Sequence, residues 1–486
     1  MGPKRPNYKW SRHYQQRSFR RHQDEMPQNS ISVPSPSSDA PQSSSAPELP
    51  GFYYDPEKNR YFRMLPGHNN CNPLTKELLQ QKEMECKRLK MLEEEKTRKK
   101  STRPGLNATM LVLKRNIGKV PVTTYCRFTH ELKAACMRRK KVSIKYPEPV
   151  GGGAHRFEFI LADSSNKRIF AVNDTENGFY RYGLVSLSGL WKDIPTVESH
   201  DNPHSTNHKV MSACWASLTA PDSHLLVCLL GKPQTQDSVS LIPTSLFRNV
   251  SSDYDHDYPE MLYNIKASNP WTCAWCANPQ LANTYAAGLK EQILVMNAVT
   301  DYRRTFRTFS DTLAQQFATQ TLLLYNGCRS GEVFSIDLRV PATPSNWKKA
   351  ASFKHSSGVT SLRLLQDENY LIVADMSGEI KMWDVRMTKP VKHYEGHNNS
   401  YALLPLHVKE DEGLLLAVGQ DCFTRIWNLQ DTKLLRTIPS PHPAAKDSIP
   451  SVVFSHQLGG PRQMAPGLLM AVKSELYYFT YDSGTF

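Results

Sequence analysis

The chain has 486 residues, 33 of them proline, and a net charge of +14. Residues 1–150 contain 30 Lys and Arg against 14 Asp and Glu, so the positive charge belongs to the N-terminal third. The sequence has neither a signal-peptide-like start nor an apolar run long enough for a membrane span, and its ten irregularly spaced cysteines argue against a disulfide framework. We therefore expect a soluble nuclear or cytoplasmic protein with no membrane partner.

Residues 1–46 form the first predicted region, a basic Ser/Pro-rich arm with almost nothing apolar to bury. This composition predicts disorder. Aromatic residues lie among the cations, which is compatible with nucleic-acid binding or a localisation signal, but a solvated tail is the simpler interpretation. The second region, 47–104, begins with aromatic runs on either side of a turn-forming Asp-Pro-Glu-Lys-Asn and predicts a hairpin. The hairpin either docks on the main body or binds a partner.

Helical patterns follow the hairpin. A Glu/Lys-rich segment over 74–100 has a poor apolar stripe and predicts a solvated helix, while residues 105–141 predict a helix-loop-helix with helices over 108–116 and 125–139. The second of these has an apolar face that includes Phe128, Leu132 and Cys136. Four cations, at 138–141, would end it, either complementing the helix dipole or forming a nuclear-import patch. The glycines at 151–153 indicate a hinge.

The region 151–486 repeats a short pattern. Ser377 to Arg386 reads Ser-Gly-Glu-Ile-Lys-Met-Trp-Asp-Val-Arg, and related copies occupy 330–339 and 421–429 at offsets of 47 and 44 residues. A turn followed by an alternating strand ending in Trp-Asp, at a period of 40 to 50 residues, is typical of a WD40 blade. We predict an all-β, seven-bladed WD40 propeller, with repeat windows at 157–187, 208–247, 271–299, 317–339, 353–396, 397–437 and 449–480.

The remaining candidates for chemistry favour structural roles. His355, Trp383, His397 and Trp427 occupy repeat positions at which the side chains usually stabilise a blade. Cys273-x-x-Cys276 lacks two further ligands at a zinc spacing, and residues three apart on a strand point to opposite faces. The chain also lacks the usual hydrolase, metalloprotease and nucleotide-binding motifs. We therefore expect no catalytic residue, no metal and no cofactor, and hence a protein that is not an enzyme.

A repeated Asp-x-Arg frame is the sharpest functional signal. Asp337 and Arg339 end one predicted strand, and Asp384 and Arg386 end the equivalent strand of the next blade. Residues two apart on a strand share a face, so each carboxylate can orient its arginine. Two guanidiniums on one rim suit docking onto a partner surface. The alternative is an ordinary exposed ion pair that contributes little.

These frames resemble the docking motif of the WD40 substrate receptors of cullin-4 RING ubiquitin ligases. Three further stretches, 49–58, 65–77 and 419–427, are similar to WD-repeat-21-type members of that family. The resemblance implies that Asp337, Arg339, Asp384 and Arg386 face the damaged-DNA-binding adaptor of the ligase. It also implies that the helix-loop-helix carrying Phe128, Leu132 and Cys136 inserts into an adaptor groove. Ile336 departs from the motif, which has Trp at that position.

The resemblance thus implies a substrate-recognition subunit that presents an unknown protein substrate to the ligase. The main alternative is a WD40 scaffold of a nuclear RNA or chromatin assembly, in which the basic arm binds phosphates.

Overall fold

The computed structural model describes the following residues: 52–55, 60–63, 76–97, 108–146, 156–175, 178–199, 204–232, 235–247, 263–341, 343, 346–445, 448–460 and 467–480. The chain divides into two compact units, Met1–Lys76 and Glu77–Phe486. In the first unit β1 (Phe52–Asp55) pairs antiparallel with β2 (Arg60–Arg63), which confirms the aromatic hairpin. The predicted arm over 1–46 and the predicted hinge at 151–153 lie outside the described residues.

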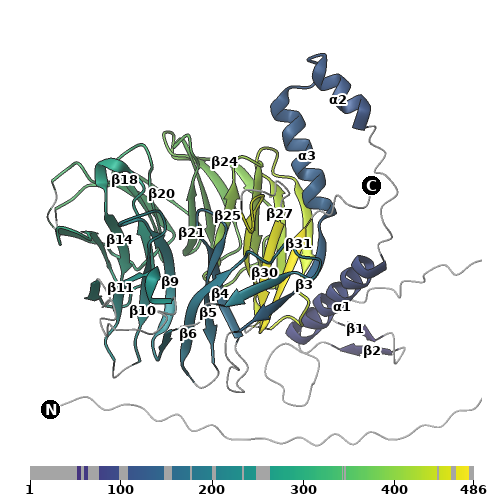
Figure 1. The fold of residues 1–486 in the computed structure, drawn as a ribbon, viewed down its shortest axis with the longest axis horizontal. Coiled ribbons are helices and arrows are strands. Elements are labelled where there is room, and N and C mark those ends of the chain that lie inside the picture. Colours follow the sequence, from purple (N-terminus) through teal and green to yellow (C-terminus); the bar gives the residue numbers. More distant parts are fainter. Residues whose placement is uncertain are drawn as a thin grey trace, which may run out of the picture. The chain divides into compact units, whose positions relative to one another are not determined.

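Five four-stranded sheets and one nine-stranded sheet form most of the described part of the second unit (Figure 1). The nine-stranded sheet contains two blades joined through β3, so we number seven blades in chain order. Blade 1 contains β4 (Arg156–Ala162), β5 (Arg168–Asp174), β6 (Tyr180–Ser186), β7 (Thr196–Ser199) and β8 (His204–Thr206). Blade 2 contains β9 (Lys209–Ala216), β10 (His224–Leu230), β11 (Ser238–Pro243) and β12 (Tyr263–Lys266). Blade 3 contains β13 (Thr272–Trp275), β14 (Thr284–Leu289), β15 (Gln292–Asn297) and β16 (Arg303–Arg307). Two short 3-10 helices, Thr244–Phe247 and Pro279–Leu281, lie in blades 2 and 3.

The C-terminal four blades follow the same plan. Blade 4 contains β17 (Thr312–Phe317), β18 (Leu323–Cys328), β19 (Glu332–Asp337) and β20 (Ala351–Lys354). Blade 5 contains β21 (Val359–Leu364), β22 (Tyr370–Asp375), β23 (Ile380–Asp384) and β24 (Lys389–Tyr394). Blade 6 contains β25 (Leu406–Lys409), β26 (Leu414–Val418), β27 (Phe423–Asn428) and β28 (Leu434–Pro439). Blade 7 contains β29 (Ser451–Ser455), β30 (Gly467–Val472), β31 (Glu475–Thr480) and, from far upstream, β3 (Arg138–Lys145).

The blades close into a ring because each shares a hydrophobic cluster with the next, and blade 7 shares one with blade 1. The following pairs of buried residues each belong to one such cluster: Phe170 and Leu225, Leu226 and Tyr285, Ala286 and Leu324, Tyr325 and Leu371, Ile372 and Leu415, Leu416 and Phe454, Leu469 and Ile169. The first strands of neighbouring blades contact one another from β9 round to β4, so they surround the axis of the ring. The seven-bladed propeller is therefore confirmed.

Each blade buries both of its faces, which explains strands without a polar side. In β23, Trp383 belongs to the cluster shared with blade 4 and stacks on Phe353 with ring centroids 4.3 Å apart, while Met382 belongs to the cluster shared with blade 6. The turn before β23 contains Gly378 at φ +83°, where a Cβ atom would lie 3.0 Å from the backbone of the next blade. The repeated Ser-Gly therefore supplies a conformation that L residues rarely adopt.

Strand β3 closes the ring. It pairs antiparallel with β31, from Arg138 opposite Thr480 to Val142 opposite Leu476, and its last three residues pair parallel with β7 of blade 1. The prediction that a helix extends to residue 139 is therefore wrong, because the helix ends at Cys136 and the four cations at 138–141 lie in a strand. They cannot complement a helix dipole. Strand pairing with a distant segment overrides the local helical pattern here.

Replacing Val142 with Asp is expected to destabilise the whole propeller by about 3 kcal/mol or more, since it places an unpaired charge in the core. The Val142 side chain is 3% exposed and belongs to the cluster shared by blades 7 and 1. Chemical denaturation of the purified chain measures the effect. The adjacent exposed residue is the control: Ser143→Asp should leave the unfolding midpoint nearly unchanged. Equal midpoints for the two variants would contradict a closing role for β3.

Three helices precede β3, namely α1 (Lys76–Thr97), α2 (Ala108–Asn116) and α3 (Val122–Cys136). The prediction that the first is a solvated helix is wrong for one face of it, where Leu79 and Arg88 are buried. The Arg88 guanidinium is 4% exposed, forms an ion pair with Glu85 and donates to the backbone oxygen of Ser440 at 2.9 Å, so α1 packs against the segment joining blades 6 and 7. The bounds of α2 agree with the prediction. Among the helices that the structure describes, none combines the length and apolar character needed to cross a bilayer.

Candidate protein-interaction site

Both predicted Asp-x-Arg frames form paired side chains at the ends of equivalent strands. Asp337 ends β19 and accepts bonds from the Nε and Nη2 atoms of Arg339 at 2.9 and 2.6 Å. Asp384 ends β23 and accepts from the Nε and Nη2 atoms of Arg386 at 3.2 and 2.9 Å. The arginine side chains are 69% and 63% exposed. Because β19 and β23 are the third strands of blades 4 and 5, both pairs lie on the same rim of the ring.

The central residue of each frame anchors it. Leu338 belongs to the core between blades 3 and 4, and Val385 packs against the core between blades 4 and 5. The guanidinium of Arg304, on the outer strand of blade 3, donates to the backbone oxygens of Leu338 and Val340 at 2.7 and 2.5 Å. Ile336, which stands where the repeat usually has Trp, is buried in the same core. Its smaller side chain leaves the Asp337–Arg339 pair intact.

The ion pairs fix the charge state of the site. Hydrogen bonds from Arg339 lower the pKa of Asp337, and those from Arg386 lower the pKa of Asp384. The same contacts raise the pKa of each arginine. The carboxylates therefore stay ionised over the physiological range and hold each guanidinium in one orientation, while the guanidinium edges not used by the aspartates remain available to acceptors outside the chain.

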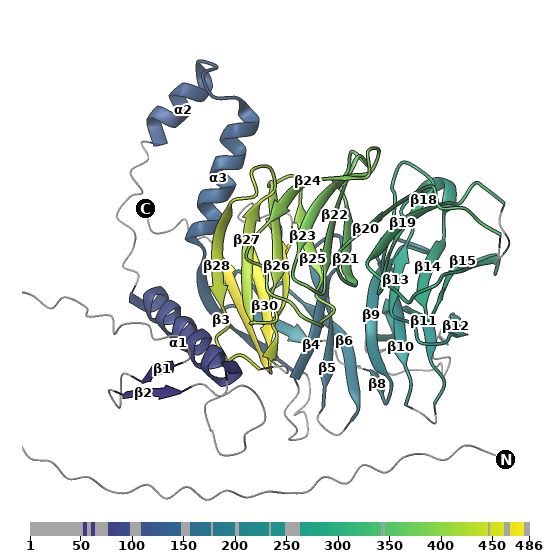
Figure 2. The ribbon, with the colours of Figure 1, turned by 180° about the vertical axis from the view of Figure 1, so that it is seen from behind.

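On blade 6, the position equivalent to Asp337 and Asp384 contacts helix α3. Asn428 ends β27 where the preceding blades have Asp, and its side chain donates to the Glu131 carboxylate of α3. Arg127, one turn earlier in α3, donates to the Gln430 side chain at 2.6 Å. Figure 2 shows α3 standing beside β27 and β28. The helix-loop-helix is thus fixed to the rim that carries the two arginine pairs, on the neighbouring blade.

Arg436 of β28 connects α3 with α1, a role that sequence inspection missed. Its Nη1 atom donates to the backbone oxygens of Ala134 and Met137, at 3.1 and 2.6 Å, and its Nη2 atom lies 3.3 Å from the Glu95 carboxylate of α1. The guanidinium therefore satisfies carbonyl groups at the C-terminus of α3, which lack partners within the helix. No local motif marks Arg436, because these partners in α1 and α3 are at least 299 residues away in the sequence.

The helix-loop-helix exposes apolar side chains. The face of α3 toward blade 6 contains Ala134, which belongs to the core between blades 6 and 7, whereas Phe128, Leu132 and Cys136 are only partly buried. Exposed apolar residues continue along α2 and the start of α3: Met110, Val112, Leu113, Ile117 and Val122. Their exposed fractions range from 41% to 57%. An apolar surface projecting from a polar rim is typical of a protein-binding element.

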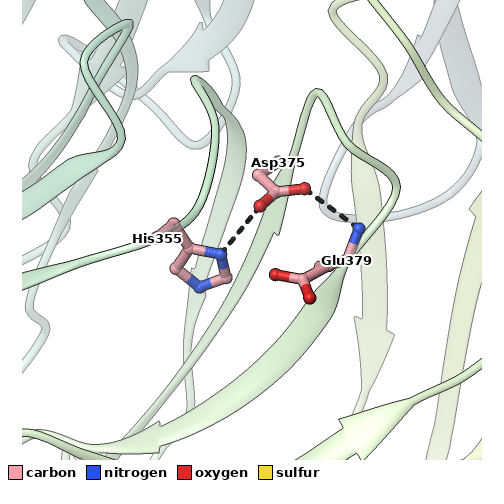
Figure 3. Close-up of side chains that lie close together, drawn as sticks. All are labelled: His355, Asp375 and Glu379. Atoms are coloured by element: carbon pink, nitrogen blue, oxygen red, sulfur yellow. Dashed lines mark hydrogen bonds and ion pairs between the residues drawn. The ribbon is translucent and has the colours of Figure 1, made fainter.

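His355 lies in a buried network, not at a reactive site. Its ring accepts from Trp383 Nε1 through Nε2 at 2.8 Å, so the proton is on Nδ1, which donates to Asp375 Oδ2 at 3.2 Å. Figure 3 shows His355, Asp375 and Glu379 close together, within the spacing of metal ligands. Since both ring nitrogens already have protein partners, His355 has no lone pair to offer a metal. The structural role predicted for His355 and Trp383 agrees with this geometry.

The equivalent network in blade 6 is different. Trp427 Nε1 donates to the Glu395 backbone oxygen at 2.9 Å instead of to His397. The His397 Nδ1 atom is buried without a partner in the described part of the chain, and burial lowers the pKa of His397 to about 4. The predicted hydrogen bond within the blade is therefore not made by this atom. The reason is local: Gly419 stands where blade 5 has Asp375, and the nearby Asp421 carboxylate is paired with Arg425.

The two cysteines of the Cys-x-x-Cys pattern face different cores. Cys273 lies between blades 2 and 3 and Cys276 between blades 3 and 4, as the strand alternation predicts. Cys273 instead donates to the Leu226 backbone oxygen of blade 2 at 3.5 Å. The neighbouring thiols of Cys214 and Cys228 lower the pKa of Cys273, and their own pKa values are raised. The pair does not form one metal site.

Comparison with known proteins identifies the family of this propeller. Residues 125–481 match the model of the DDB1- and CUL4-associated factor 4 beta-propeller domain. The chain belongs to this family. It is 54% identical over 449 residues to DDB1- and CUL4-associated factor 4 of Homo sapiens, covering 92% of this chain and 90% of the relative. It is 47% identical over 398 residues to the Homo sapiens DDB1- and CUL4-associated factor 4-like protein 2, covering 82% and 100%.

A more distant relative also matches over most of the chain. The WD repeat-containing protein 21 of Schizosaccharomyces pombe is 23% identical over 401 residues, covering 78% of this chain and 87% of the relative. The family match begins inside α3 and ends just after β31. The matched segment of this chain therefore includes β3, the strand that closes the ring, and most of α3, as well as the two Asp-x-Arg frames.

Proposed function

We propose that this protein is a substrate-recognition subunit of a cullin-4 RING ubiquitin ligase and that it docks on the adaptor DDB1. The observation that carries the proposal is the pair of exposed, carboxylate-oriented arginines on adjacent blades, in a chain more than half identical to a protein named as a DDB1- and CUL4-associated factor. The receptor supplies no reacting group. It increases the effective concentration of a bound protein near the ubiquitin-charged subunit of the ligase.

Two surfaces support the proposed docking. Arg339 and Arg386 present planar donor groups that match carboxylates or clustered carbonyl oxygens on a partner. On the neighbouring blade, the helix-loop-helix offers an apolar surface that can enter a groove. The predicted contacts of Phe128, Leu132 and Cys136 belong to this surface, together with the exposed residues of α2. An apolar anchor beside two oriented cations provides both burial and specificity.

The direct experiment is titration of the purified chain with purified DDB1, followed by calorimetry or surface plasmon resonance. We expect one-to-one binding in the nanomolar to micromolar range, which is usual for interfaces of standard size. DDB1 that shows no interaction with the folded chain at micromolar concentration would end the proposal. A second titration adds the cullin-4 scaffold, which should join the complex only when DDB1 is present.

Ile117 and Val122, which we call the apolar tip of the helix-loop-helix, give a sharper test. The double variant Ile117→Asp/Val122→Asp is expected to weaken DDB1 binding at least tenfold, since the two side chains are 57% and 56% exposed and available to a partner. Their exposure also means that folding should be unaffected. The control is Phe309→Asp, which changes a fully exposed aromatic residue in the turn between β16 and β17, on the opposite rim. Unchanged affinity for the tip variant would exclude the helix-loop-helix from the interface.

A further inference from the structure

A pocket of about 360 Å³ lies between α1 and the outer edge of blade 7. It is lined by Leu92, Lys96, Arg139, Lys141, Pro441 and Tyr477. Its size is at the lower end of the range for small-molecule sites. The two arginine pairs proposed to dock on DDB1 belong to blades 4 and 5, so this pocket is distinct from those pairs.

The strand β3 explains how the cations reach the pocket. Side chains alternate along a strand, so Arg139 and Lys141 share one face while Arg138 and Lys140 share the other. In the antiparallel register Arg139 lies opposite Phe479 and Lys141 lies opposite Tyr477. The strand therefore separates the four consecutive cations into two pairs, and the side chains of Arg139 and Lys141 point toward α1.

Helix α1 supplies the third cation from a fixed position. Lys96 lies in the last turn of α1, next to Glu95, which pairs with Arg436 of blade 6. Arg88, two turns earlier, is buried against the segment joining blades 6 and 7. The contacts of Arg88 and Glu95 thus hold α1 against the ring at two positions along the helix. Lys96, Arg139 and Lys141 converge from two elements whose relative position is set by buried contacts.

The charges in the pocket are only partly balanced. Lys141 Nζ pairs with Glu475 Oε1 at 2.5 Å, and the His442 ring and the Tyr477 hydroxyl also contact this carboxylate. Within the part of the chain that the structure describes, neither Lys96 nor Arg139 forms an ion pair. The Arg139 guanidinium lies 5.8 Å from the centroid of the Tyr477 ring, a contact that leaves its donors unused. The pocket therefore has an excess of positive charge.

We propose that this pocket binds a compact ligand that carries two or more phosphate groups. Arg139 offers a planar donor fork and the two lysines offer point charges, a combination suited to phosphate oxygens. A ligand with a single negative charge would match only one of the two unpaired cations. Leu92 and Pro441 supply an apolar wall for the part of the ligand that bears the phosphates. The limited volume favours a small molecule or a lipid headgroup over a nucleic-acid strand.

Calorimetric titration of the full chain with inorganic tripolyphosphate tests the proposal. We expect one-to-one binding that weakens at least tenfold in the double variant Lys96→Ala/Arg139→Ala and weakens steeply with added salt. The matched control, Lys192→Ala/Lys290→Ala, removes the same charge from exposed positions on blades 1 and 3 and should bind as the unaltered chain does. Tripolyphosphate that does not bind, or that binds the double variant and the unaltered chain equally, would overturn the proposal.

A variant that is expected to bind more tightly shows that the changes in affinity do not come from loss of folding. Glu475→Gln removes the carboxylate that pairs with Lys141 of the pocket lining and is expected to tighten tripolyphosphate binding severalfold, because a like charge near the ligand is gone. Weaker binding by this variant would also contradict the proposal. Sedimentation with phosphatidylcholine vesicles, with or without phosphatidylinositol bisphosphate, then distinguishes a lipid headgroup from a soluble ligand. Co-sedimentation with the bisphosphate vesicles that is lost in Lys96→Ala/Arg139→Ala identifies a lipid headgroup. A chain that binds tripolyphosphate but does not co-sediment with these vesicles has a soluble ligand.

Discussion

Replacing Arg339 and Arg386 together with alanine is expected to weaken DDB1 binding by two orders of magnitude or more. A central interface arginine contributes about 2 kcal/mol or more when it is truncated, and the two lie on separate blades, so their effects should largely add. Both side chains are mostly exposed in the free chain, so their loss should change the free energy of unfolding by less than about 0.5 kcal/mol. The binding assay is titration with purified DDB1, accompanied by thermal denaturation.

Two comparisons make this experiment specific. The variant Arg303→Ala/Arg307→Ala removes two exposed arginines from the outer strand of blade 3 and should bind DDB1 normally. Replacing Arg339 and Arg386 with Lys keeps the charge but loses the planar fork that Asp337 and Asp384 orient, so an intermediate affinity is expected. A folded double-alanine variant with undiminished affinity would place the DDB1 interface elsewhere on the molecule.

Replacing Asp375 with alanine is expected to destabilise the chain by about 3 to 5 kcal/mol, the usual cost of removing one partner from a buried charged network. The carboxylate is fully buried and accepts bonds from His355, Ser356, Ser377 and the Glu379 backbone at 2.7 to 3.2 Å. The donors of His355, Ser377 and the Glu379 backbone would lose this acceptor, while Ser356 would keep its bond to the Glu379 carboxylate. Chemical denaturation measures the loss. The matched control is Asp311→Ala, which breaks an ion pair with Arg329 near the surface and should cost less than about 1 kcal/mol.

The same carboxylate makes stability depend on pH. Despite burial, hydrogen bonds from His355, Ser377, Glu379 and Ser356 lower the pKa of Asp375 well below its ordinary value. A group whose pKa is lower in the folded state stabilises that state above its unfolded pKa, about 3.9 for Asp, and the contribution is lost as the pH falls toward the folded pKa. Unfolding free energy should therefore fall between about pH 5 and 3, and the fall should be smaller in Asp375→Asn. Identical slopes would contradict this assignment.

Sequence periodicity was sufficient to predict the ring and its two arginine pairs. Trp383 on one face and Met382 on the other indicate a sheet buried on both sides, and the Asp-x-Arg frames recur at the ends of such strands. The turn glycines mark the same positions in successive repeats. These features are local, because in blades 4 and 5 the turn, the strand and its final carboxylate are formed by adjacent residues.

Contacts between distant segments were not predictable in this way. The cations at 138–141 extend a helical pattern, yet pairing with β31 places them in a strand. The burial of Arg88 depends on carbonyl groups at 440 and 441, and Arg436 contacts two helices more than 290 residues upstream. In each of these cases the deciding partner lies far away in the chain. His397 differs from His355 for a reason within its own blade, because Gly419 stands where blade 5 has Asp375.

The closure of the ring by β3 has a consequence for synthesis of the protein. Its partner β31 ends at residue 480, so the first and last elements of the propeller pair only after the residues up to 480 have left the ribosome. Until then, the edges of blades 1 and 7 expose unpaired backbone groups, which are prone to join other chains. We expect a nascent chain that stops before residue 475 to be retained by chaperones or degraded, because it cannot complete its circular core.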